Sequence, residues 1–142
     1  MRSTFGAEKV SDAVLLVARI LLILLFVIFG WKKLIGFGGT VAYFSHGNVP
    51  LPFLAALIAV VMEFFAGIAI ALGLFTRPLA LMMALYTLGT ALLGHPFWHL
   101  AGTARVENEI NFLKNVGLIG GFLLLYVTGA GRYALDDKID AI

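Results

Sequence analysis

The stretch VVMEFFAGIAIALGLFTRP, residues 60–78, decides the fold of this chain. It is an apolar run long enough to cross a bilayer as a helix, and its single ionisable residue before the closing Arg77-Pro78 is Glu63. A carboxylate inside such a helix costs several kcal/mol unless another group hydrogen-bonds to it or neutralises it. We therefore expect the rest of the chain to supply partners for Glu63.

The composition identifies an integral membrane protein. Of the 142 residues, 61% are hydrophobic and 13% are charged, and the mean hydropathy is +1.01, whereas soluble domains carry about 25% charged residues. The length allows four membrane spans of about 20 residues each, joined by short loops, with no separate soluble domain. We therefore predict an all-α fold: a four-helix transmembrane bundle that forms a single domain over residues 1–142.

The spans follow from the apolar runs and the residues that bound them. Ser11 and Asp12 are expected to cap the first helix, and Pro78 suits the first turn of the third. The link of residues 36–52 contains a short stretch, Thr40 to His46, that we expect to form an interfacial helix ended by Gly47. The four predicted transmembrane helices cover about residues 13–34, 53–74, 78–94 and 108–128.

The charges predict an orientation and exclude some functions. Five basic residues fall on the side of the two termini and three on the other, so the positive-inside rule places both termini in the cytoplasm, with the protein in the cell (inner) membrane. The five are Arg2, Lys9, Arg77, Arg132 and Lys138, and the three are Lys32, Lys33 and Arg105. Without a basic block, nucleic acid is not an expected partner. The chain has no Cys, which excludes disulfides and thiolate metal sites.

The two histidines of the second outer link do not indicate a metal site. His95 and His99 are four residues apart, the spacing at which a helix can present two metal ligands, but Pro96 lies between them and no carboxylate or thiol completes a set. We interpret them as interfacial residues.

Counting helical rise from the predicted helix ends places polar residues at similar depths. Arg19 lies about 10 Å above the cytoplasmic edge, Glu63 and Tyr86 about 14 Å, and Lys114 about 21 Å. Asn111 lies on the amide stripe beside Lys114. We therefore predict one buried cluster in which Arg19 is the salt-bridge partner of Glu63 and Tyr86 donates to the carboxylate.

Two interpretations of this cluster are open. In the first it is structural, because charges within membranes usually pair and such a pair can hold helices in register. In the second it lines a site for a small polar or quinone-like ligand. The predicted cluster has two cations, Arg19 and Lys114, and one carboxylate, Glu63. One positive charge is therefore unmatched, which would suit a bound anion or a quinone carbonyl.

Three segments resemble the DoxX family of small bacterial and archaeal membrane proteins, and in particular its inner-membrane branch. They are FGWKKLIGFGGT at 29–40, VVMEFFAGIAIALGLFTRP at 60–78 and NFLKNVGLIGG at 111–121. The resemblance covers roughly residues 13–130 and implies a four-helix transmembrane bundle. The positions that it marks are Gly30, Lys33, Gly36, Phe37, Glu63, Gly73, Thr76, Arg77, Asn111 and Lys114.

What the resemblance implies about activity is less specific. Some family members are subunits linked to quinone-coupled sulfur oxidation, and others resemble parts of oxidative-stress or electron-transfer assemblies. We therefore expect a non-catalytic subunit of a redox or quinone-linked membrane complex, with quinone as a candidate cofactor and a redox protein or a second copy as partner in the bilayer. The alternative is a small transporter or channel that works as an oligomer, because one four-helix bundle has little room for a pathway. An enzyme that acts alone on a quinone or a lipid is the third interpretation.

Overall fold

The computed structural model describes residues 7–139, and every regular element in that range is helical. Four segments of it are long and apolar enough to cross a membrane, as the sequence predicts. They are Ser11–Ile35 within α1 (Ala7–Ile35), Pro52–Leu72, Thr76–His99 and Gly102–Thr128, which is α6. Pro52–Leu72 is made of α3 (Pro52–Val60), the π-helix η1 (Val61–Ala66) and α4 (Gly67–Leu72), and Thr76–His99 contains α5 (Thr76–Gly94) and the 3-10 turn η2 (Phe97–His99).

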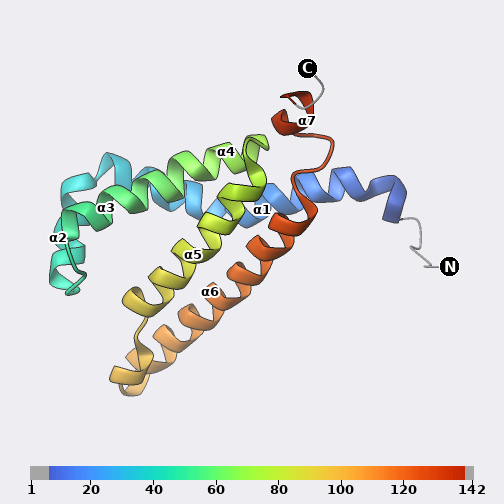
Figure 1. The fold of residues 1–142 in the computed structure, drawn as a ribbon. Coiled ribbons are helices and arrows are strands. Elements are labelled where there is room, and N and C mark those ends of the chain that lie inside the picture. The colour runs from blue at the N-terminus through green and yellow to red at the C-terminus, as the bar shows by residue number, and fades with distance from the viewer. Residues whose placement is uncertain (1–6, 140–142) are drawn as a thin grey trace.

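The four spans form two antiparallel pairs (Figure 1). One pair is α1 with the continuous run of α3, η1 and α4, and the other is α5 with α6. The pairs meet near the turn between α4 and α5, and they diverge toward α2 (Phe37–His46) on one side and the α5–α6 connection on the other. The space between the diverging pairs is where the candidate site lies.

Local sequence explains where α4 ends and α5 begins. Gly73 adopts the left-handed conformation (φ 72°), and the amides of Gly73 and Leu74 donate to Ile70 and Ala69, so α4 closes in a Schellman motif two residues before the predicted end. Pro78 lies in the first turn of α5, which begins at Thr76.

Other boundaries differ from the prediction. The interfacial helix is longer than expected, because α2 already begins at Phe37, but it ends at Gly47 as predicted. The helix α6 begins at Gly102, six residues before the predicted start at 108. The predicted cap at Ser11 and Asp12 is wrong, because α1 begins at Ala7 and both residues lie inside it.

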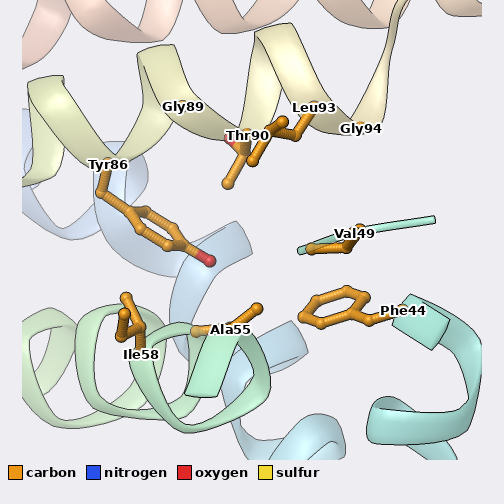
Figure 2. A pocket seen from close by; sticks show the side chains of 10 residues that line it. Phe44, Val49, Ala55, Ile58, Tyr86, Gly89, Thr90, Leu93 and Gly94 are labelled. Atoms are coloured by element: carbon orange, nitrogen blue, oxygen red, sulfur yellow. The ribbon is translucent and has the colours of Figure 1, made fainter. Parts of the chain in front are cut away.

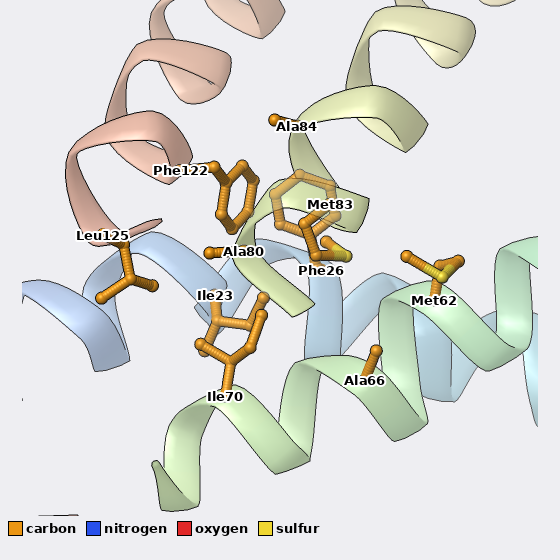
Figure 3. Packing of buried hydrophobic residues seen from close by; sticks show 10 residues of the cluster. All are labelled: Ile23, Phe26, Met62, Ala66, Ile70, Ala80, Met83, Ala84, Phe122 and Leu125. Atoms are coloured by element: carbon orange, nitrogen blue, oxygen red, sulfur yellow. The ribbon is translucent and has the colours of Figure 1, made fainter. Parts of the chain in front are cut away.

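The hydrophobic core forms where all four spans meet. Figure 3 shows ten buried side chains that converge there from α1, η1, α4, α5 and α6, with the rings of Phe26 and Phe122 5.4 Å apart at its centre. Gly67 and Gly121 allow close approach to α1, since a Cβ at either position would lie 2.9 Å from a side chain of that helix. The core thus holds the two helix pairs together at the end where the termini lie.

The segment after α6 is fastened to the same end of the bundle. Arg19, which is 1% exposed, donates to the backbone carbonyls of Ala130, Ala71 and Tyr133. The Asp136 carboxylate, in α7 (Leu135–Ile139), accepts from the amides of Phe75 and Thr76 at the start of α5, and the Asp136 amide donates to the Gly73 carbonyl. This end is therefore held by hydrogen bonds as well as by apolar packing.

Candidate functional site

Glu63 lies at the point where the two helix pairs begin to diverge, and its side chain is only 10% exposed. Its carboxylate accepts a hydrogen bond from the Lys33 ammonium at 2.7 Å and another from the Tyr86 hydroxyl at 2.6 Å. The three groups come from α1, η1 and α5, so they join the two helix pairs through polar contacts. The predicted hydrogen bond from Tyr86 is confirmed.

The backbone around Glu63 explains how α1 comes so close to it. A Cβ at Gly30 would lie 2.5 Å from the amide nitrogen of Phe64 and 2.8 Å from the Cβ of Glu63, distances that side chains do not tolerate. Only glycine fits there, and Lys33 follows one helical turn later on the same face of α1. Glu63 itself lies in the π-helix η1, a distortion that is frequent at functional sites because the extra residue in the turn re-aims side chains.

An apolar cleft of about 270 Å³ extends from Tyr86 into the space between α3 and α5. Figure 2 shows the Tyr86 ring at one end of it, with the hydroxyl directed between the two helices. The hydroxyls of Tyr86 and Thr90 are the polar side-chain groups among its lining residues, and Thr90 already donates to the Thr87 carbonyl. The lining residues are Phe44, Val49, Ala55, Ile58, Ala59, Tyr86, Gly89, Thr90, Leu93 and Gly94.

The arrangement leaves hydrogen-bonding capacity at the edge of an apolar space. Lys33 and Glu63 neutralise each other, so the pair adds no net charge. An ammonium has three N–H donors and Lys33 uses one of them on Glu63, while the Tyr86 oxygen can still accept a hydrogen bond as well as donate one. A ligand with an apolar body and one polar end therefore matches the cleft and its edge.

The predicted pairing of Arg19 with Glu63 is wrong. Arg19 donates to the carbonyl of Ala71, which lies eight residues beyond Glu63 and hence about 12 Å farther along the same span. The depth count assumed that α1 starts at the membrane edge next to Asp12. In the structure α1 extends farther toward the terminus, so that Arg19 lies level with the end of α4 and Lys33, not Arg19, lies level with Glu63.

Asn111 and Lys114 do not contact the Glu63 carboxylate either. The Lys114 ammonium donates to the Asn111 side chain at 3.1 Å, one turn away on the same helix, and the contact is exposed. The amide that turns inward on α6 is that of Asn115, which is buried and lies 3.4 Å from the Thr90 hydroxyl. The five predicted site residues thus separate into three places: Arg19 beside the end of α4, Glu63 with Tyr86 between the helix pairs, and Asn111 with Lys114 on α6.

Sequence reasoning missed Lys33 as the partner of Glu63. The Trp31-Lys32-Lys33 run looks like an interfacial anchor, and hydropathy places Lys33 at the outer end of its span, so neither signal links it to a buried carboxylate. The resemblance marked both Gly30 and Lys33, which face η1 together. The fact that the family resemblance marks both residues is the sequence feature that could have indicated Lys33 as the partner of Glu63.

Comparisons with known proteins agree with the membrane fold. A family model described as DoxX matches residues 14–96. The chain is 53% identical to the inner membrane protein YphA of Escherichia coli over 134 residues, 94% of both chains, and 42% identical to the E. coli inner membrane protein YqjF over 129 residues, 91% of this chain and 94% of that one. It is also 26% identical to the ER-derived vesicles protein ERV29 of Saccharomyces cerevisiae over 96% of this chain and 40% of the yeast protein. No solved structure matches the chain.

Proposed function

This chain belongs to the DoxX family of integral membrane proteins, and on that premise we propose that it binds a lipid-soluble, quinone-like ligand in the cleft beside Tyr86. In this role it is a non-catalytic subunit that holds the ligand for a redox partner in the membrane. The observation that carries the proposal is the buried carboxylate of Glu63, held by Tyr86 and Lys33 at the edge of an apolar cleft.

The chemistry of the cleft favours a ligand of this class. Its walls are made mainly of aliphatic, aromatic and glycine residues, which suit a hydrocarbon chain or a ring face. A quinone carbonyl needs one hydrogen-bond donor, and the Tyr86 hydroxyl can turn from Glu63 to supply it while Lys33 continues to neutralise the carboxylate. Electrons would come from a partner or a bound group, since the chain has no Cys for a thiol route.

The test compares two glycine substitutions in the intact protein. Gly89 lines the cleft, whereas Gly120 does not, and a Cβ at either position meets nothing within 4 Å. Gly89→Leu should fill the cleft and abolish the binding of a short-chain ubiquinone, measured by ligand-induced stabilisation in neutral detergent and by native mass spectrometry. Gly120→Leu should bind it like the wild type. Equal binding by both variants, or none by the wild type, would contradict the proposal.

A second pair of variants tests the polar end. Tyr86→Phe should weaken binding about tenfold, the loss expected for one hydrogen bond inside an apolar site. Tyr126→Phe is the control, because Tyr126 lies on the outer surface of α6 and does not line the cleft. If Tyr86→Phe binds the quinone as tightly as the wild type, the Tyr86 hydroxyl does not recognise the quinone carbonyl, and that part of the proposal is wrong.

Transport by an oligomer is the second candidate, and the exposed pair of Asn111 and Lys114 is the observation that favours it. A polar pair on the outer face of a span suits an interface between copies that lines a pathway. Solute flux in proteoliposomes that Lys114→Met abolishes would support this function; flux without dependence on Lys114 would oppose it. In either function we propose that both termini are cytoplasmic, on the charge count given above.

A further inference from the structure

A second pocket, of about 330 Å³, opens where α1 ends and α2 begins. We infer that it binds a phosphate group, either that of an anionic phospholipid or a free phosphate ion. Its lining shares only Phe44 with that of the apolar cleft, although Lys33 also belongs to the Glu63 cluster, so binding at the two pockets can be tested by different substitutions. The lining residues are Phe29, Lys32, Lys33, Gly36, Gly39, Thr40, Tyr43 and Phe44.

The charge of this pocket is not balanced. Lys33 is neutralised by Glu63, but Lys32 forms no ion pair and no hydrogen bond with any residue in the range 7–139. The Lys32 ammonium lies 4.9 Å from the centre of the Phe29 ring, a contact that leaves its N–H donors available. Two donors of Lys33 also remain, so the pocket has one net positive charge and several N–H groups for an anion.

The backbone adds to this preference. Gly39 lines the pocket in the first turn of α2, where the first amides of a helix have no acceptor within it and the dipole favours negative charge; the amide of the N-cap residue Gly36 already donates to the Lys32 carbonyl. A Cβ at Gly39 would meet nothing within 4 Å, so the backbone there is accessible. The volume far exceeds the about 10–15 Å³ that one water molecule requires, which leaves room for a group the size of phosphate.

The pocket lies beside the end of the first span. Tyr43 in its lining and Trp31, which precedes Lys32 in the chain, are both exposed aromatic residues of the kind that is enriched near lipid headgroups. Basic pockets between or beside membrane helices are known to take anionic headgroups. An anionic phospholipid thus has its phosphate at the height of Lys32 and its acyl chains along the apolar surface of α1.

The experiment uses the full chain in neutral detergent with dioleoyl-phosphatidylglycerol, dioleoyl-phosphatidylcholine or inorganic phosphate as the probe, and native mass spectrometry counts bound molecules. We expect tighter binding of phosphatidylglycerol than of phosphatidylcholine. Lys32→Gln should weaken phosphatidylglycerol binding about fivefold, the contribution of one lysine near an anionic headgroup. Arg105→Gln is the matched control, because Arg105 falls on the same predicted side of the membrane as Lys32 and likewise lies over an aromatic ring, that of Phe97, but does not line the pocket.

Gly39→Leu is a second variant that keeps every charge. Its side chain should occupy the pocket and abolish binding, and it replaces a helical glycine by a better helix former, so the fold is retained. The inference is overturned if Lys32→Gln and Arg105→Gln weaken binding equally, or if Gly39→Leu binds like the wild type. If inorganic phosphate binds with the same dependence on Lys32 and displaces the lipid, the site is one for free phosphate; if it does not, the lipid is the source.

Discussion

Removal of the Lys33 ammonium is the most direct test of how the buried carboxylate is held. In Lys33→Met the Glu63 carboxylate keeps the hydrogen bond from Tyr86 but loses its counter-ion inside the bundle. Breaking a buried ion pair from one side costs roughly 3–5 kcal/mol. Because the Lys33 side chain is 24% exposed and water screens part of the attraction, we expect the low end of that range, about 3 kcal/mol of unfolding free energy.

A double-mutant cycle separates this loss from simple changes in packing. Once Lys33 is Met, Glu63→Gln should restore much of the stability, because the amide oxygen still accepts from Tyr86 and no charge remains buried. The coupling energy should reach about 2 kcal/mol or more, well above the error of about 0.5 kcal/mol for independent sites. Unfolding by sodium dodecyl sulfate in mixed micelles, followed by circular dichroism, measures all four proteins.

The cycle of Glu63→Gln with Lys114→Met is the control. Lys114 bonds to Asn111 on its own helix, so the two changes should be additive within about 0.5 kcal/mol. A Lys33–Glu63 coupling no larger than the Lys114–Glu63 coupling would refute the ion pair as the contact that joins α1 to η1.

Three further substitutions test the packing around this pair and the fastened end of the bundle. Gly30→Ala should destabilise the protein by about 1–3 kcal/mol, because its Cβ meets the η1 backbone at 2.5 Å, whereas Gly38→Ala, in open space, should not; equal midpoints would contradict the close approach. Arg19→Met should cost at least about 3 kcal/mol of unfolding free energy, since three carbonyls lose a charge-assisted hydrogen bond. Arg19→Lys should recover only part of that stability. Full recovery of the unfolding midpoint by Arg19→Lys would show that the forked geometry of the guanidinium is not needed. Asp136→Ala should cost about 1 kcal/mol by uncapping α5, while the same change at exposed Asp137 should not alter the midpoint.

Composition and local pattern were sufficient for the fold class and for two of the three members of the polar cluster, Glu63 and Tyr86. Apolar runs of bilayer length predict the four spans because a helix satisfies its backbone hydrogen bonds within each run, as lipid requires. A buried carboxylate requires a donor, and Tyr86, at the matching depth on the third span, was predicted as that donor and is found there. These conclusions depend on the order and spacing of residues within each span, which the sequence by itself determines.

The tertiary structure alone decided which cation meets Glu63. Hydropathy does not fix the axial position of a helix, because α1 exposes similar apolar residues to lipid when it slides along its axis. That position is set by contacts between distant segments: Gly30 against the backbone of η1, and Arg19 against carbonyls of α4 and of the segment after α6. With α1 held in this position, Lys33 lies beside the Glu63 carboxylate and Arg19 lies far from it. The cleft beside Tyr86 lies where the two helix pairs diverge.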